Sequence, residues 1–407
     1  MKRVLTYILA GGKGERLNPL TKDRAKPAVP FGGIYRIIDV TLSNCINSGL
    51  RRIYLLTQYK SFSLQKHVTA GWWDIVSSQL GEFIDLVPAQ QRISADWYQG
   101  TADAIFQNIY TIHDHTPDLI LILAGDHVYK MDYQDMIDEH CRRGADVTVC
   151  GIPMPAETSR SFGVLEVDDQ ARICGFQEKP EQPRTIPGSP DKIFASMGVY
   201  LFKADALCEE LAIDAKNAGS AHDFGKNIIP QMLERNRKVY VHDFVDETGG
   251  PAYWRDIGTR DAYYEANLDL ISPDPGFDIY DRKWPLRTNH IQHPPIKALT
   301  FTDENGQDQG GTIENSMVAG GCILTGAHVR GSLLSPNVRL APRTEVDRSI
   351  LMHGVQVGEG ARIRNAIIDK DNIIPAGEQI GYDLERDRER YDVTASGIVI
   401  VAKKQRQ

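Results

Sequence analysis

A glycine-rich segment near the amino terminus carries basic residues and could bind a polyphosphate. Residues 11–16 read GGKGER, and a lysine follows ten residues after the arginine, within the sequence KPA. Glycines let a backbone approach phosphate oxygens, while N–H groups, lysine and arginine supply donors and positive charge. The segment matches neither GxGxxG nor GxxxxGK[ST], so alone it also fits an ordinary tight turn. The candidate nucleotide contacts are Gly11, Gly12, Lys13, Gly14, Arg16 and Lys26.

Two aspartates stand where carboxylates could hold a divalent cation. Asp126 lies in the GDH that follows the apolar run 119–124, and Asp256 lies far along the chain within WRDIG. Mg²⁺ prefers oxygen ligands, and it neutralises the repulsion between two phosphate substrates while it steadies a leaving pyrophosphate. The alternatives are a turn or helix cap for Asp126 and an ordinary acid for Asp256. Because phosphoryl-type transfer depends on positioning and charge, we expect no nucleophilic cysteine or serine.

A scattered set of polar residues could together hold a sugar phosphate. A lysine would bind the phosphate, a carboxylate or hydroxyl would bind sugar hydroxyls, and a glycine would permit close approach of the backbone. Each residue alone is equally explained as a surface ion pair, a turn or a core side chain, so only the set favours such a pocket. The set consists of Tyr98, Gly163, Glu178, Lys179 and Ser196.

Alternating strand-like and helix-like segments over residues 1–271 predict the domain that positions these side chains. Apolar runs at 4–10 and 119–124 predict buried strands, and amphipathic stretches at 102–113 and 133–143 predict helices. We therefore expect an α/β domain with a doubly wound, mostly parallel sheet. Ligands of such sheets bind beyond the carboxyl ends of the strands, which is where the glycine loop and the first aspartate follow their apolar runs.

A proline-rich stretch at 272–300 predicts a surface linker to a second domain over residues 301–407. In this second domain, single apolar residues recur with a period of seventeen residues in three rows. The rows are Ile323, Leu340, Val357 and Ile374; Val329, Val346, Ile363 and Ile380; and Leu334, Leu351 and Ile368. Rows with one fixed period predict a three-sided parallel β-coil, each face of which points one aliphatic residue inward. The alternative is a β-rich domain whose spacing is accidental.

The composition excludes several classes of protein. The chain has 407 residues, a net charge of −8 and 42% hydrophobic residues, which is typical of a globular protein and argues against a nucleic-acid partner. No apolar run approaches the ~20 residues of a membrane helix, and the first run is too short for a signal peptide. The six cysteines are scattered without a CxxC pair, which favours reduced thiols in a cytoplasmic enzyme over disulfides or a zinc site.

The motifs together resemble the bacterial glucose-1-phosphate adenylyltransferase family. The loop LAGGxGxRL followed by KPA is shared by sugar-phosphate nucleotidyltransferases, whereas PAQQR, WYxGTADA and HDFGK are narrower marks of the branch that makes ADP-glucose for glycogen synthesis. The resemblance implies a Rossmann-like nucleotidyltransferase domain followed by a left-handed parallel β-helix of hexapeptide repeats. It also implies ATP and glucose 1-phosphate as substrates, Mg²⁺ as cofactor, small phosphorylated effectors and a homotetramer.

The resemblance further implies a role for individual residues. Catalysis would fall to Arg16, Lys26 and Asp126, and Mg²⁺ would be bound by Asp126 and Asp256. ATP would contact Gly11, Gly12, Lys13, Gly14, Arg16, Lys26, Gln91, Gly100 and Thr101. Glucose 1-phosphate would contact Tyr98, Gly163, Glu178, Lys179 and Ser196. Effector phosphates would bind between the domains at Arg24 and Arg36. Asp23 and Pro30 replace a lysine and a histidine of some relatives there, which leaves the identity of the effector open.

Three alternatives remain at the level of the sequence. The glycine loop and the candidate sugar-phosphate lysine would also serve a pyrophosphorylase for another nucleotide sugar, against which the ADP-glucose motifs argue. A non-catalytic regulatory subunit would be expected to lack the loop arginine or lysine, which this chain retains. An acyltransferase built on the β-helix could use His328 or His353, but the array of repeats is short.

Overall fold

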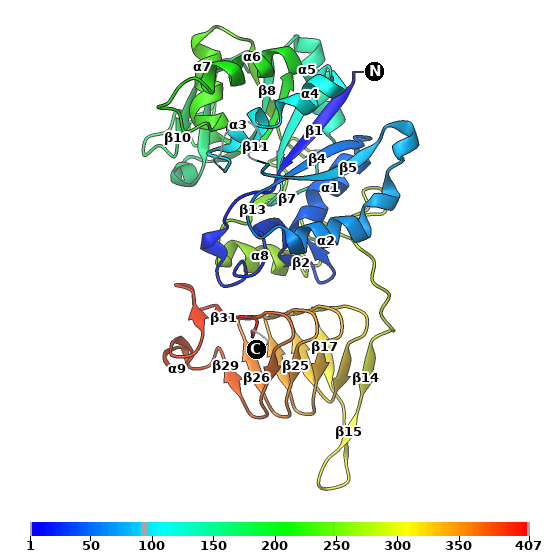
Figure 1. Cartoon of the computed structure of the whole chain (residues 1–407). Helices are drawn as coiled ribbons and strands as arrows, with labels where there is room; N and C mark the ends of the chain where they lie inside the picture. The colour runs from blue at the N-terminus through cyan, green and yellow to red at the C-terminus, as the bar shows by residue number, and fades with distance from the viewer. Residues whose placement is uncertain (1, 91–96, 247, 405–407) are drawn as a thin grey trace.

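The computed structural model describes residues 2–90, 97–246 and 248–404, and it contains an α/β domain followed by a coil of short strands (Figure 1). An extended segment along one side of the molecule joins the two parts (Figure 1). Within the described residues, no helix is both long enough and apolar enough to cross a membrane.

A nine-stranded sheet forms the centre of the α/β domain. Its main path runs β10-β9-β11-β6-β1-β4-β5, and β8 and β12 join it through β11. These strands are β1 (Val4–Leu9), β4 (Arg52–Thr57), β5 (Phe83–Pro88), β6 (Leu119–Ala124), β8 (Val147–Pro155), β9 (Gly163–Val167), β10 (Ile173–Glu178), β11 (Lys192–Lys203) and β12 (Val239–Asp243). The expectation of a mostly parallel sheet was wrong: β6, β1, β4 and β5 are parallel, but β11 runs antiparallel to β6, β8 and β9.

The predicted strands 4–10 and 119–124 are confirmed as β1 and β6, and β6 is almost wholly buried. The helices of the domain are α1 (Ile37–Asn47), α2 (Phe62–Gly71), α3 (Thr101–Phe106), α4 (Ile109–His115), α5 (Tyr133–Arg143), α6 (Ala204–Asp214), α7 (Ile229–Glu234) and α8 (Arg260–Asp269). Helix α5 has the predicted bounds. The predicted helix 102–113 is divided into α3 and α4, because the amide of Asn108 donates to Ala104 O and Tyr98 Oη at the break.

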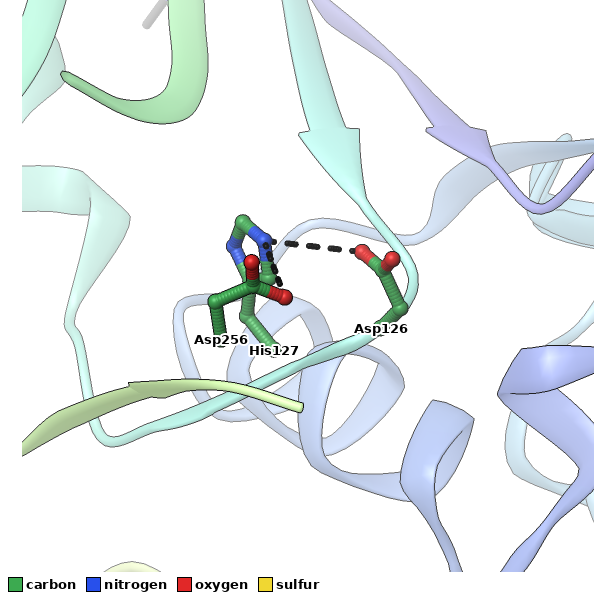
Figure 2. A group of neighbouring side chains, drawn as sticks. All are labelled: Asp126, His127 and Asp256. Carbon is green, nitrogen blue, oxygen red and sulfur yellow. Dashed lines mark ion pairs between the residues drawn. The ribbon is translucent and has the colours of Figure 1, made fainter. Parts of the chain in front are cut away.

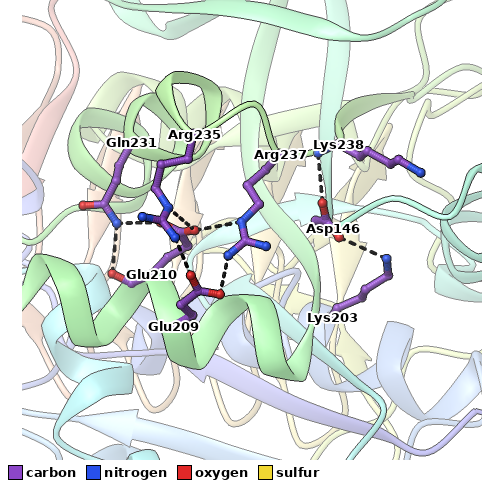
Figure 3. Close-up of polar contacts among 8 residues, drawn as sticks. All are labelled: Asp146, Lys203, Glu209, Glu210, Gln231, Arg235, Arg237 and Lys238. Atoms are coloured by element: carbon purple, nitrogen blue, oxygen red, sulfur yellow. Dashed lines mark hydrogen bonds and ion pairs between the residues drawn. The ribbon is translucent and has the colours of Figure 1, made fainter.

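A network of ion pairs fastens α6 to α7 (Figure 3). The fully buried carboxylate of Glu210 accepts hydrogen bonds from Arg235 Nε at 3.1 Å, Arg237 Nε at 3.0 Å and Gln231 Nε2 at 2.7 Å. Neighbouring Glu209 pairs with both arginines nearer the surface. Because α7 continues directly from the π-helical turn Phe224–Ile228, this network also fixes that turn.

The second domain is the predicted coil of parallel strands. Its three sheets consist of β14 (Lys297–Leu299), β19 (Ile323–Thr325), β22 (Arg339–Leu340), β25 (Gln356–Val357) and β28 (Ile373–Ile374); of β17 (Thr312–Glu314), β20 (His328–Arg330), β23 (Glu345–Asp347), β26 (Arg362–Arg364) and β29 (Gln379–Ile380); and of β18 (Met317–Val318), β21 (Leu333–Leu334), β24 (Ile350–Leu351), β27 (Ala366–Ile368), β31 (Val399–Val401) and β30 (Asp392–Val393). A hairpin of β15 (Phe301–Thr302) and β16 (Asp308–Gln309) projects from the first turn, and α9 (Leu384–Arg388) lies near the end (Figure 1).

The register of the coil confirms two of the predicted rows and corrects the third. Val329, Val346, Ile363 and Ile380 are partners on successive turns, as are Leu334, Leu351 and Ile368. In the remaining row, Leu340 pairs with Leu324 rather than with Ile323. The first turn is one residue shorter than the others, so Leu324 points inward and is buried while Ile323 is only partly buried.

One face of the coil packs on the α/β domain. Leu333, Ile350, Ile367 and Ile400 follow one another in register on the third sheet, next to the inward row. They form one apolar cluster with Leu17, Val29 and Tyr263 of the α/β domain. This sheet has two consecutive apolar residues in several of its strands, such as Leu333 and Leu334, because both of its faces are buried.

Candidate active site

Two antiparallel strands bring the predicted carboxylates together. β7 (His127–Tyr129) begins just after β6, and it pairs with β13 (Trp254–Asp256) so that His127 lies opposite Asp256. His127 Nε2 is 3.6 Å from Asp126 Oδ1 and 3.8 Å from Asp256 Oδ1, so that one imidazole nitrogen faces both carboxylates (Figure 2). Ligand atoms of the three residues all lie within 4.8 Å of one another.

The side chain of Lys26 reaches this carboxylate pair from the amino-terminal segment. Its Nζ donates to Asp126 Oδ2 at 2.6 Å and to Asp256 Oδ1 at 3.3 Å, and Lys26 is 7% exposed. Burial opposes the charge of Lys26, but the two carboxylates outweigh burial and raise the pKa of the ammonium. Burial also opposes ionisation of Asp126, but the charges of Lys26 and His127 hold its pKa well below the usual range. The site thus concentrates charged groups in a partly enclosed space.

Arg16 lies near Asp256, because the two side chains approach the same glycine, Gly258. A Cβ atom added to Gly258 would be 3.0 Å from Arg16 Nη2 and 3.0 Å from Asp256 Oδ2, so both groups flank this glycine. Gly14 adopts a left-handed conformation with φ 64°, and a Cβ there would be 3.1 Å from Lys26 Cβ. The absence of a side chain at Gly14 therefore permits the close approach of Lys26 to the glycine loop.

A cleft of about 700 Å³ opens from Asp126 along the carboxyl ends of the parallel strands. Among the predicted residues, it is lined by Gly11, Gly12, Lys13, Tyr98, Gly100, Thr101 and Asp126. A Cβ on Gly12 would meet no atom within 4 Å, so the backbone there faces open space. A Cβ on Gly100, by contrast, would lie 2.2 Å from His222 O, which makes glycine necessary in this wall. The hydroxyl of Thr101 is engaged with Asp223 Oδ2 at 3.0 Å and Phe224 N at 3.1 Å.

Four of the five predicted sugar-phosphate residues lie on or next to neighbouring strands at one end of the sheet. Gly163 on β9 is paired with Glu178 on β10, and Lys179 N donates to Phe162 O at 3.1 Å. Ala195 on β11 is paired with Val164, which puts Ser196 next to Gly163. These four residues do not line the cleft, whereas the fifth predicted contact, Tyr98, does. β11 links the four to the cleft, because Gly198 and Tyr200 form part of the cleft wall.

Other cleft residues were not predicted individually. Gln58 and Tyr59 follow β4, and Lys13 Nζ lies 5.6 Å from the centre of the Tyr59 ring. Asp223 and Lys226 belong to the HDFGK motif, on which the resemblance to the family partly rests. The motif did not indicate that these two residues line the cleft together with the glycine loop. The predicted ATP contact Gln91 lies outside the described residues.

A second cavity of about 400 Å³ lies between the α/β domain and the coil. Arg36, Lys370 and His353 are among its lining residues. Burial and the charges of Arg36 and Arg24 lower the pKa of Lys370 to about 8. Arg24 does not line the cavity; its Nη2 donates to Asp369 Oδ1 at 2.9 Å and Oδ2 at 2.7 Å.

Comparison with known proteins agrees with this architecture. The family model described as "Nucleotidyl transferase" matches residues 5–272, and that described as "GlmU-like, C-terminal hexapeptide" matches residues 294–401. A glucose-1-phosphate adenylyltransferase of Koribacter versatilis is 52% identical over 99% of this chain and 96% of its own length. Proteins with the same name from Rhodopirellula baltica and an Anaeromyxobacter species are 51% and 47% identical, over 99% and 100% of this chain and 90% and 99% of their own lengths. The chain thus belongs to the glucose-1-phosphate adenylyltransferase family of nucleotidyl transferases.

Proposed function

We propose that this chain transfers the adenylyl group of ATP to glucose 1-phosphate, giving ADP-glucose and pyrophosphate. The observation that carries the proposal is that Lys26 bridges the carboxylates of Asp126 and Asp256, and that Asp126 lines one cleft with the glycine loop, in a chain of this family. A phosphate oxygen of glucose 1-phosphate would attack the α-phosphorus of ATP as the bond to pyrophosphate breaks. Both substrates are anions, so the protein's task is to align them and offset their charge.

Asp126 and Asp256 fit a divalent cation. Carboxylate oxygens are the ligands that Mg²⁺ prefers, and the two side chains come close enough to share one ion. When bound there, Mg²⁺ would supply neutralisation of the phosphate charge and would orient the leaving pyrophosphate. Lys26 already lies against both carboxylates, so its ammonium would adjoin the phosphates that the ion brings in.

The amino-terminal loop is suited to the triphosphate. The backbone at Gly12 faces open space and could offer an N–H group, and Lys13 and Arg16 add positive charge from the same segment. Gly100, Thr101 and Tyr98 would form the opposite wall. We assign no contact to Gln91 beyond the one that the family resemblance implies.

The sugar phosphate would occupy the end of the cleft towards β9, β10 and β11. Lys179 is half exposed and pairs only loosely with Glu178, at 3.8 Å, so its ammonium is available to a phosphate. Glu178 and Ser196 would accept from and donate to sugar hydroxyls, and Gly163 would let the sugar approach the backbone.

Pyrophosphate release by the purified chain tests this proposal. With glucose 1-phosphate and Mg²⁺ fixed, we expect ATP to support turnover at least about tenfold faster than UTP, dTTP or GTP, a difference that corresponds to about 1.4 kcal/mol. Preference for another nucleotide would favour the alternative of a pyrophosphorylase for a different nucleotide sugar. No turnover with any nucleotide would favour the non-catalytic regulatory subunit.

We also propose that a small phosphorylated effector binds in the cavity between the domains. Lys370 and Arg36 both line this cavity and repel each other, and an anion placed between them would relieve that repulsion, which supports the proposal. Inorganic phosphate should therefore raise the thermal unfolding midpoint of the protein, and Lys370→Met should lose most of the rise. Lys297→Met, on the exposed strand β14, should keep it. Equal shifts in both variants would contradict the assignment.

A homotetramer is our proposal for the assembly. Phe62, Trp73 and Leu80 are 78%, 57% and 72% exposed and lie close together in the sequence, which supports an interface there. Light scattering should give four times the chain mass of 45.5 kDa, and Leu80→Lys should lower it. A monomer mass at micromolar concentration would be contrary to the proposal.

A further inference from the structure

A buried ion pair joins the coil to the segment that carries Lys26. The side chains of Arg24 and Asp369 are 8% and 1% exposed, and Arg24 Nη2 bridges both carboxylate oxygens. Asp369 follows β27 directly and is held by the coil, since its backbone N donates to Val401 O and its carbonyl accepts from Asn372 Nδ2. The carboxylate is therefore a fixed point of the second domain.

The chain between Arg24 and Lys26 is short and enclosed. Only Ala25 separates them; it is 2% exposed, and its N donates to Lys60 O at 3.2 Å. Lys26 then begins a buried 3₁₀ turn with Pro27 and Ala28, whose N returns to Ala25 O. Because the residues of this segment are buried and closely packed, they cannot readily rearrange to absorb a movement of Arg24. Such a movement would therefore also shift Lys26.

We propose that Arg24 and Asp369 are positioning residues that hold the Lys26 ammonium against Asp126 and Asp256. The inference rests on the adenylyl transfer proposed above and adds a role for the coil in that reaction. In this arrangement the second domain contributes no atom to the substrates. It sets the location of a catalytic side chain through one ion pair and two intervening peptide bonds.

Packing alone does not account for this ion pair. The apolar row of Leu333, Ile350, Ile367 and Ile400 already attaches the coil to the α/β domain. Removing two charges from water is costly, and apolar residues of similar volume often stabilise a protein as well as a buried pair does. An ion pair differs from apolar packing in that the hydrogen bonds to the carboxylate fix the orientation of the guanidinium.

A variant that exchanges the ion pair for apolar residues separates the two roles. In Arg24→Met/Asp369→Leu, we expect the thermal unfolding midpoint to stay close to that of the wild type. We expect kcat for ADP-glucose formation to fall at least about tenfold, which corresponds to about 1.4 kcal/mol, while KM for glucose 1-phosphate changes less than about twofold. The matched control is Arg330→Met/Asp347→Leu, because that pair has bonds of 3.0 Å on the outside of the coil. The control should leave kcat unchanged.

A mutant cycle tests whether the effect passes through Lys26. In a Lys26→Arg background, the apolar exchange should cost less than about twofold in kcat, because the positioned group has already been replaced. Equal fractional losses in both backgrounds would overturn the proposal, as would a wild-type kcat in the apolar variant. If that variant does not fold, Arg24→Lys and Asp369→Asn replace it, and we expect Arg24→Lys to recover more activity than Asp369→Asn. A wild-type enzyme without adenylyl transfer would instead refute the proposed function.

Discussion

The ammonium of Lys26 lies between the carboxylates of Asp126 and Asp256, 2.6 Å from the first and 3.3 Å from the second. The three residues come from segments far apart in the sequence, and the pairing of β7 with β13 brings the two aspartates together. The negative potential that holds this lysine is also what would attract a divalent cation. The arrangement of these charged side chains is therefore what would allow the site to bind a divalent cation and phosphate groups.

Neutralising Asp126 should abolish most turnover without unfolding the protein. We expect Asp126→Asn to lower kcat by about 100-fold or more, on the order of 3 kcal/mol, because an amide removes one of the two charges that balance the phosphates. Asp118→Asn is the control, since Asp118 lies at the opposite end of β6. Pyrophosphate release and thermal unfolding of both variants check this, and a near-normal rate for Asp126→Asn would remove the metal assignment.

A methyl group on Gly12 should interfere with ATP and leave stability unchanged. Its Cβ would meet no protein atom within 4 Å, so it would project only into the space that we assign to the triphosphate. We expect Gly12→Ala to raise KM for ATP about tenfold, which corresponds to about 1.4 kcal/mol of binding. Gly219→Ala, where a Cβ would be in ordinary contact with Asn217, should change neither KM nor the unfolding midpoint. An unchanged KM for Gly12→Ala would argue against the loop as the phosphate site.

The corrected row of the coil predicts a difference between two adjacent residues. Leu324 faces the interior, so Leu324→Ala should lower the free energy of unfolding of the coil by about 2–5 kcal/mol. Ile323→Ala should cost less than about 1 kcal/mol, because that side chain is only partly buried. Denaturant unfolding of the two variants provides the measurement. The reverse order would mean that the period of seventeen extends unchanged to the first turn.

Buried His140 predicts a loss of stability in acid. Burial and the charge of Lys203 lower the pKa of His140 to about 4 from its ordinary value of 6.5, and its Nδ1 contacts Thr148 Oγ1 at 2.9 Å. Between these values the unfolded chain binds the proton and the folded one does not. Stability is thus complete above pH 6.5 and declines as the pH falls to about 4, by at most about 3 kcal/mol.

The comparison of wild type with His140→Gln isolates this contribution, because nearby carboxylates titrate in both proteins. Urea unfolding should show a smaller decline between pH 6.5 and 4.5 in the variant. Parallel declines in the two proteins would show that His140 accepts a proton in the folded state as easily as in the unfolded one.

Much of the architecture follows from local patterns. The unbroken apolar run of β6 and the amphipathic pattern of α5 were predictable because burial sets the spacing of apolar residues along neighbouring positions. The antiparallel course of β11 was not, because strand direction depends on partners that periodicity does not identify. The inward position of Leu324 in place of Ile323 was likewise not predictable, since it results from one shorter turn of the coil.

The site was predictable where a motif marks it. Asp126 and Lys26 stood out by their positions, and the structure brings them into contact. The pairing of Asp369 with Arg24 could not be predicted, because the two residues are 345 positions apart and Asp369 belongs to no motif. Lys226 was part of a quoted motif, but only the fold reveals that it lines the cleft.

The most direct test of the account is a crystal structure of the enzyme with ADP-glucose and Mg²⁺. We predict that the diphosphate lies against Gly11, Gly12 and Lys13, with the metal ion held by Asp126 and Asp256 and the glucose beside Glu178. A nucleotide sugar bound away from both the glycine loop and the carboxylate pair would contradict it.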